Sequence, residues 1–422
     1  MWWNGWPLVF NDTGSYLETA RTGVNFIQQS PGYGMFLHLL LRIWHRPEII
    51  ALAQATLVVV SLWHLGRVIG TPRRRLVVIM AAIAVATPIP LLCAMLLPDA
   101  IFLAGTACLF ALIIRRQPVQ LIGPIVIVSL AMTVHYATAP LYLVILLVSL
   151  TVLYLSPRQS EVKKATRRLI YILAAIFFST QFALRVLYPR PHIPVWSTNV
   201  VAQLVDENGL IIDELKDTCD EVQYSLCPHI QLISGTTADH FLWRSDQALQ
   251  QFGGWDHVPA DWQRLIFATV KHHPEQTIRW IFDRWQEQFF TFQIGYEFSF
   301  FSWDHTLSKS IENSFGRQSA QAQLSSKQEQ QWFNPMPKPW PQVYDTVAVA
   351  SVLAPLLLWL LWRRDKQRHL AVVLLTALLV NALIMGTVSH PQNRYQFRLL
   401  YLPLVILVFS AATPRPNRPQ EY

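Results

Sequence analysis

The chain has 422 residues, of which 52% are hydrophobic and only 14% are charged, and its formal net charge is +8. Soluble domains carry about 25% charged residues, so this composition excludes an ordinary soluble domain. The basic residues stand at the ends of apolar runs and do not gather in one soluble segment, which argues against nucleic acid as a partner. The sequence therefore predicts an all-α polytopic membrane protein.

Residues 1–48 are expected to form an outer first loop with a surface helix. The motif Asn-Asp-Thr-Gly-Ser-Tyr-Leu at 11–17 places Asp12 among residues that favour turns and helix N-caps, and this is the simplest interpretation of Asp12. The motif Ser-Pro-Gly-Tyr-Gly at 30–34 then breaks the chain before the apolar stretch 35–44. That stretch is too short to span a membrane, so it predicts an amphipathic or re-entrant helix at the surface.

Nine apolar runs, each about 16–21 residues long, are near the length that crosses a hydrocarbon layer of ~30 Å. A helix is the expected form, because every backbone polar group must be satisfied within the segment. The runs are 49–68, 76–96, 99–114, 119–136, 138–155, 168–187, 344–363, 369–388 and 396–412. They predict six spanning helices in 49–187 and three in 344–412, with kinks at the internal prolines 88, 90, 124 and 355.

Lys and Arg set the expected orientation. Seventeen of these residues fall on one set of connections and five on the short connections of the other side with the N-terminal segment. The larger set belongs to the cytoplasm by the positive-inside rule. The N-terminus is then outside and the tail 413–422 is cytoplasmic, and we expect a further spanning helix ahead of Met1.

Residues 188–343 form a large extracytoplasmic loop with more acidic than basic side chains and many Trp and Phe residues. Apolar residues three and four positions apart predict a small helical domain on the outer membrane surface. Its aromatic side chains suit a core or interfacial anchors, or else a platform for stacking sugars. Cys219 and Cys227 predict a local disulfide in an oxidising compartment; a metal pair with nearby His229 is the alternative.

Several polar residues stand at the outer ends of the predicted spans. Asp99 follows a proline at the start of a span and suits an N-cap or a functional carboxylate. His135 ends another span, where a histidine is either a structural bystander or part of a site. Arg394 and Arg398 are four residues apart and share a face if the last helix starts early. They suit interfacial anchors or a phosphate clamp, because guanidinium presents a planar donor fork.

Several catalytic motifs are missing from the sequence. It has no phosphate-cradling glycine loop, no His-Glu-x-x-His and no Gly-x-Ser-x-Gly. A transferred group would therefore come from a donor reached on the outer side. A lipid or solute transporter is one alternative, although charges at the span centres are scarce. A non-catalytic envelope assembly protein is another.

The motifs at 11–17 and 30–34, Asp99 after Pro98, His135 and the pair Arg394–Tyr395 before the last span together resemble a known family. They are similar to the membrane glycosyltransferases of the GT-C fold, which include protein mannosyltransferases and bacterial transferases that attach aminoarabinose to lipid A. The resemblance implies a GT-C-like helix bundle with an outer-face soluble loop domain. It also implies a multi-pass protein of the bacterial inner membrane.

The resemblance further implies roles for individual residues. Asp12 matches the acidic residue that acts as catalytic base or orients the acceptor. Asp99 would assist at the acceptor or bind a divalent cation, which is the one cofactor considered. Arg394, with Arg398 second, would hold the phosphate of a polyprenyl-phosphate sugar donor. The acceptor would be a glycan, a lipid or a protein. The residues assigned to substrate binding are Tyr16, His135, Arg394, Tyr395 and Arg398.

Overall fold

A computed structural model describes residues 3–24, 29–114, 122–154, 174, 176–178, 195–206, 209–244, 248–293, 305–333, 336–361 and 365–414. The regular structure of these residues is helical, and their only β-type pairing is an isolated parallel bridge between Leu8 and Met95. The chain divides into two compact units, which we describe separately. Unit 1 consists of Met1–Tyr188, Phe292–Leu378 and Gln396–Tyr422, and unit 2 of Pro189–Thr291 and Leu379–Tyr395.

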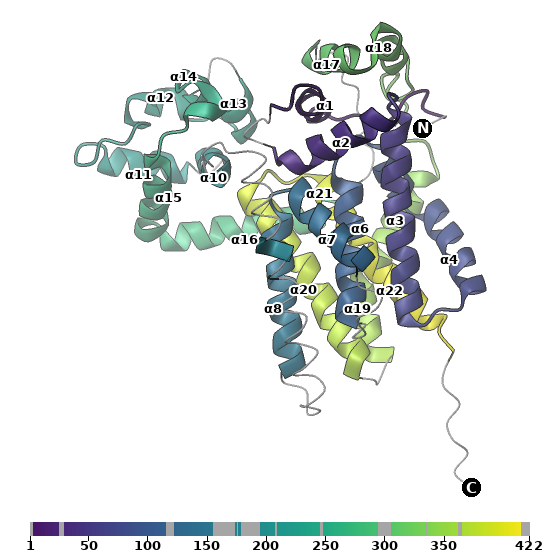
Figure 1. The fold of residues 1–422 in the computed structure, drawn as a ribbon. Coiled ribbons are helices and arrows are strands. Elements are labelled where there is room, and N and C mark those ends of the chain that lie inside the picture. Colours follow the sequence, from purple (N-terminus) through teal and green to yellow (C-terminus); the bar gives the residue numbers. More distant parts are fainter. Residues whose placement is uncertain are drawn as a thin grey trace. The chain divides into compact units, whose positions relative to one another are not determined.

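The helices of unit 1 come from both ends of the chain (Figure 1). The N-terminal set is α1 (Thr13–Thr22), α2 (Pro31–Ile43), α3 (Glu48–Ile69), α4 (Arg73–Ala86), α5 (Ile89–Ala94), α6 (Asp99–Ile114), α7 (Ile122–Val134) and α8 (Thr138–Tyr154). The later set is α17 (His305–Phe315), α18 (Arg317–Leu324), α19 (Trp340–Leu361) and α22 (Leu402–Ala411). Helices α20 (Asp365–Val388) and α21 (Asn393–Leu400) contribute residues to both units.

Four helical segments of the described chain are long and apolar enough to cross a membrane, which indicates a membrane protein. They are Glu48–Ile69, Trp340–Leu361, Arg368–Val388 and Asn393–Ala411. These four correspond to the predicted spans 49–68, 344–363, 369–388 and 396–412. Three predicted spans are apolar helices of shorter length, namely α6, α7 and α8. Apart from a few positions, the predicted span 168–187 lies outside the described residues.

The prediction of a single span at 76–96 is wrong, because the structure divides this run into the two helices α4 and α5. Helix α4 ends at Ala86, and Thr87 is extended with φ −126° and ψ 156°. A residue before proline is pushed out of the helical region by the proline ring, and Pro88 follows Thr87. The prolines at 88 and 90 therefore do more than kink this run, since they end one helix and begin another.

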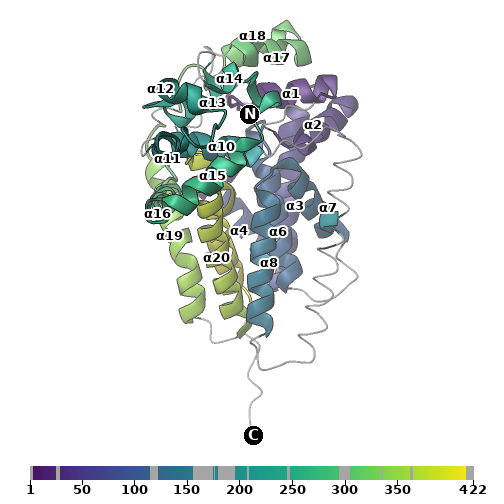
Figure 2. The ribbon, with the colours of Figure 1, turned by 90° about the vertical axis from the view of Figure 1, so that its left-hand side faces the viewer.

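The helices of unit 1 pack closely around α6 (Figures 1 and 2). Helix α6 lies against α3 on one side and against α7 on the other. A Cβ atom added to Gly105 of α6 would clash with Ala131 of α7, so the glycine permits this close approach. Both α6 and α3 contain polar residues that are completely buried, including Thr106 and Gln54. Helix α6 is thus an interior helix of unit 1.

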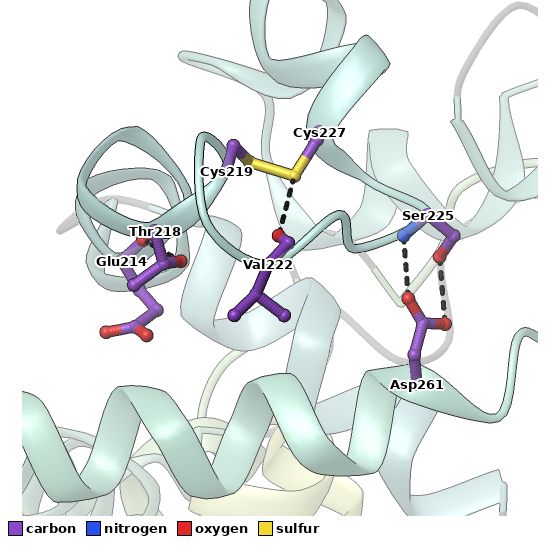
Figure 3. The surroundings of a disulfide bond; sticks show 7 residues. All are labelled: Glu214, Thr218, Cys219, Val222, Ser225, Cys227 and Asp261. Atoms are coloured by element: carbon purple, nitrogen blue, oxygen red, sulfur yellow. Dashed lines mark hydrogen bonds between the residues drawn. A yellow bond between two sulfur atoms is a disulfide. The ribbon is translucent and has the colours of Figure 1, made fainter.

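Unit 2 is a small helical domain with its own apolar core. Its helices are α10 (Val195–Val205), α11 (Leu210–Thr218), α12 (Ile230–Ile233), α13 (Ala238–Trp243), α14 (Ala248–Gln251), α15 (Asp261–His272) and α16 (Pro274–Phe290), with short 3-10 turns at Cys227–His229 and Gly254–His257. Trp262 of α15 is fully buried in the core. Ser225 anchors the start of α15, because Asp261 accepts hydrogen bonds from its N (2.6 Å) and Oγ (3.0 Å) (Figure 3).

Cys219 and Cys227 form the disulfide predicted from their spacing (Figure 3). It closes the segment after α11, and Ser225 with its bond to Asp261 lies inside that loop. The cross-link therefore holds a loop that is also tied to the start of α15. The free cysteines among the described residues, Cys93 and Cys108, are buried.

The predicted loop domain 188–343 does not form a single unit. Residues 189–291 belong to unit 2, while α17 and α18 belong to unit 1, where α17 packs beside α1 (Figures 1 and 2). Gly14 of α1 permits that contact, because a Cβ there would lie 3.3 Å from the Leu307 Cα. Gln328 fixes the N-terminal strand-like segment, accepting from the N–H of Val9 and donating to its carbonyl. The later half of the predicted loop thus supports the first helix.

Candidate functional site

Asp12 stands immediately before α1, where it occupies the N-cap position. Its side chain is half-buried and makes no capping hydrogen bond. Its backbone carbonyl instead accepts hydrogen bonds from Ser15 Oγ (2.9 Å) and Gln29 Nε2 (3.3 Å). The turn at Asp12 is therefore held through its backbone, and the carboxylate has no capping role in α1.

Asp99 and Arg398 form a buried ion pair in unit 1. Arg398 Nη1 lies 3.6 Å from Asp99 Oδ1, and the two residues are 0% and 3% exposed. Arg398 also stacks its guanidinium over the Phe102 ring, 4.1 Å from the centroid. Asp99 Oδ1 accepts no hydrogen bond from the described residues. Burying charged groups is costly, so this pair is a strong candidate for a functional centre.

Tyr16 is in ring contact with Tyr33, whose hydroxyl is influenced by the charge of Asp99. Tyr16 meets Tyr33 of α2 edge-on, with ring centroids 4.9 Å apart. Burial of Tyr33, reinforced by the nearby Tyr16 and Asp99, raises the pKa of its hydroxyl well above the usual value. That hydroxyl donates to Gln54 Oε1 at 2.8 Å. Tyr33, which sequence reasoning did not single out, therefore lies between two of the predicted site residues.

Gln54 of α3, which accepts the Tyr33 hydrogen bond, also links α3 to the end of α5. Its Nε2 donates to the carbonyls of Cys93 (3.0 Å) and Met95 (2.7 Å) at the end of α5. The last carbonyls of a helix have no partner within the helix, so Gln54 satisfies them. A lone glutamine in an apolar span is a signal for such a role, and it could have been read from the sequence.

The motif at 30–34 brings α2 against its neighbours. A Cβ on Gly32 would clash with the Thr133 backbone of α7, and a Cβ on Gly34 would clash with Thr19 of α1. Ser30 Oγ also donates to the Thr133 carbonyl. A helix is present at the predicted place, and it begins at Pro31, earlier than the predicted 35–44. Its two glycines let it fit between α1 and α7.

His135 lies at the turn between α7 and α8. Its Nδ1 accepts a hydrogen bond from the N–H of Ala137 at 3.2 Å, which fixes the start of α8. The next residue, Tyr136, donates to the carbonyl of Gln29 at 3.0 Å. Because Gln29 also donates to the Asp12 carbonyl, this turn is linked to the start of α1. His135 thus has a structural role close to the predicted site.

Arg394 and Tyr395 belong to unit 2, whereas Arg398 belongs to unit 1. Helix α21 starts at Asn393, so the early start that places Arg394 and Arg398 four residues apart on one helix is confirmed. Arg394 is buried; its Nε donates to Gln392 Oε1 (2.9 Å) and its Nη2 to the Tyr395 hydroxyl (3.1 Å). The two arginines predicted to hold the donor phosphate, Arg394 and Arg398, therefore belong to different units.

Within unit 1, Asp99 pairs with Arg398, Tyr16 contacts Tyr33 of α2, and Gln29 links the Asp12 carbonyl to the turn before α8. The described residues contain no group of three or more His, Cys, Asp or Glu side chains suited to hold a metal ion. A pocket of about 320 Å³ lies between α3, α6 and α7, with Ser61, His64 and Cys108 in its lining, and includes none of the predicted residues.

Comparisons of the chain with protein-family models, with curated proteins and with solved structures found no match.

Proposed function

We propose that this protein is a membrane glycosyltransferase of the GT-C type. It would move a sugar from a polyprenyl-phosphate donor to a glycan, lipid or protein acceptor on the extracytoplasmic face of a bacterial inner membrane. The observation that supports this most is the Asp99–Arg398 pair, which is buried in unit 1, the unit that also contains Asp12. Ionisable residues buried at helix ends in a membrane protein usually serve a function.

The proposed reaction forms a bond between an acceptor oxygen or nitrogen and the anomeric carbon of the sugar. The bond between that carbon and the phosphate oxygen breaks, and polyprenyl phosphate leaves with the bonding electrons. Asp12 takes the proton of the acceptor, as a general base does. Fixed cations stabilise the charge that develops on the phosphate. Lipid phosphate is already a good leaving group, so no protein acid is required.

The structure suggests a division of roles among the other residues. Arg398 is buried against Asp99 and Phe102, so Asp99 acts as a positioning residue that fixes this cation. Arg394 remains the candidate for direct contact with the donor phosphate, held by Gln392 and Tyr395. Tyr16 and Tyr33 would pack beside the transferred group.

The test uses the purified chain in liposomes with a radiolabelled sugar linked to undecaprenyl phosphate. Transfer of the label to an envelope extract, lost in Asp12→Asn and strongly reduced in Arg394→Gln, supports the proposal. Uptake of the intact labelled donor into sealed vesicles, without transfer, would support a transporter. Full transfer by Asp12→Asn would remove Asp12 from the mechanism.

A further inference from the structure

Helix α16 of unit 2 presents three different faces. Its buried face holds Trp280, Arg284 and Gln288, four residues apart. Beside it, Ile278 and Phe282 project outward and are 68% and 54% exposed. Charged and amide residues fill the remaining surface: Glu275, Gln276, Arg279, Asp283, Gln286 and Glu287. A helix at a membrane surface typically has these three faces: one packed on the protein, one apolar and exposed, and one polar.

The preceding helix also has exposed apolar residues. Phe267 and Val270 of α15 are 65% and 41% exposed, and α15 ends at His272, directly before α16 begins at Pro274. Exposed apolar residues are common singly, but several on two adjacent helices indicate an interaction surface. We define the exposed strip as Phe267, Val270, Ile278 and Phe282.

Contacts within unit 2 tie α16 to the C-terminal part of α20. A Cβ on Gly386 would clash with the carbonyl of Arg284, so the two backbones meet there (Figures 1 and 2). Trp285 extends along α20 and donates its Nε1–H to the Leu379 carbonyl at 3.1 Å. Gln288 exchanges hydrogen bonds with Gln392, donating to its carbonyl and accepting from its N–H.

These contacts place α16 at a particular depth. The segment Arg368–Val388 of α20 is one of the four helices able to cross a membrane. Gly386 is two residues from its end, or about 3 Å along a helix. Leu379 is nine residues from the end, or about 13 Å, which approaches one leaflet of a hydrocarbon layer ~30 Å thick. The contacts of α16 with α20 therefore fall within the last ten residues of this segment, toward the end where a spanning helix leaves the hydrocarbon.

We propose that α15 and α16 lie in the membrane interface, with the exposed strip inserted into the lipid leaflet that surrounds the C-terminal end of α20. Tryptophan and phenylalanine favour this boundary, and the polar face of α16 keeps contact with water. The partner is the bilayer itself. The inference depends on α20 spanning the membrane and is independent of any sugar transfer.

The test places a fluorescent bimane label at Phe282→Cys and, as the matched control on the polar face, at Gln276→Cys. Gln276 is exposed and lies about 120° around the helix from Phe282. Both variants are made in a background with Cys93→Ala and Cys108→Ala, without reductant, so that the disulfide stays intact. The purified chains are reconstituted at low density into phosphatidylcholine liposomes that contain a nitroxide-labelled phospholipid.

Several-fold stronger quenching at position 282 than at 276 is the expected result. Ile278→Cys tests the same strip independently and should match Phe282→Cys. Equal quenching at 282 and 276 would overturn the proposal. Weak quenching at both 278 and 282 would also overturn it, and would indicate that another protein surface, such as a second copy, covers the strip.

Discussion

Each unit buries a carboxylate, and the two carboxylates have different partners. Asp99 in unit 1 faces Arg398 at 3.6 Å, and its Oδ1 accepts no hydrogen bond from the described residues. Glu214 in unit 2 is also buried, but both of its oxygens lie 3.0–3.1 Å from His272 Nδ1. His273 Nε2 is 3.4 Å from the same carboxylate.

The difference distinguishes a carboxylate with hydrogen-bond partners from one that faces only a charged partner. Buried polar groups are normally satisfied, and Glu214 follows this rule by joining α11 to the junction of α15 and α16. Asp99 departs from this rule. Its partner Arg398 always carries a positive charge, but Asp99 Oδ1 accepts no hydrogen bond from the described residues. Such departures mark places where a protein keeps a group for a task.

The largest expected effect comes from breaking the ion pair of unit 1. Arg398→Ala leaves Asp99 as a buried charge without its cation, which costs about 3–5 kcal/mol of folding free energy. Thermal unfolding of the purified chain in detergent measures this loss. Arg42→Ala, at an exposed position of α2, should leave the unfolding temperature unchanged.

A double variant sharpens the same comparison. Asp99→Asn combined with Arg398→Gln removes both charges and should recover much of the stability lost in Arg398→Ala. Wild-type stability of Arg398→Ala would mean that the pair is not buried as the structure describes.

The second-largest expected loss of stability comes from removing the disulfide of unit 2. Replacing Cys219 and Cys227 by serine opens the loop that follows α11, with an expected loss of about 2–4 kcal/mol. Limited proteolysis of the folded chain should then cut first in the segment between these positions. Unchanged protease resistance in the double serine variant would show that the cross-link adds nothing to the stability of unit 2.

Glu214 should give a smaller effect. Glu214→Ala leaves the His272 imidazole without its acceptor and costs about 0.5–1.5 kcal/mol. Glu214→Gln keeps an oxygen for the His272 N–H and should cost less. The rate of amide hydrogen exchange in α11 and α15 measures the loss of stability in both variants. Equal exchange in the two variants would contradict a hydrogen-bonding role for the carboxylate.

Asp12→Asn should have the smallest effect on folding. The side chain makes no cap bond, and asparagine is as good an N-cap residue as aspartate, so the change in stability should be under about 0.5 kcal/mol. The unfolding temperature of the purified variant checks this. A large loss of stability would show that the Asp12 carboxylate is part of the fold and would undermine its proposed role as a base.

Hydropathy and proline chemistry explain how much of the fold was predictable. Helix α6 has the predicted bounds 99–114, because a long apolar run after a proline defines a helix locally. The prolines at 88 and 90 predict only kinks, but the helix ends completely at Thr87, because the two nearby prolines act together. The disulfide was predictable because its two cysteines are eight positions apart.

The site was less predictable, because its contacts join distant parts of the chain. Asp99 and Arg398 were both selected from the sequence, but their pairing depends on how α6 and α21 pack. No local pattern contains that information. Tyr33 was visible only as part of a glycine motif, and its position beside Tyr16 follows from the close packing that the glycines allow.

The most direct test of the proposed function compares two carboxylates near the start of the chain. Sugar transfer from labelled undecaprenyl-phosphate donor is measured in liposomes for the wild type, Asp12→Asn and Glu18→Gln, where Glu18 pairs with exposed Arg21 on α1. General-base catalysis contributes about 10²–10⁴-fold, so Asp12→Asn should lose transfer by that factor while Glu18→Gln retains it. Equal transfer by the two variants, or no transfer by the wild type, would contradict the account.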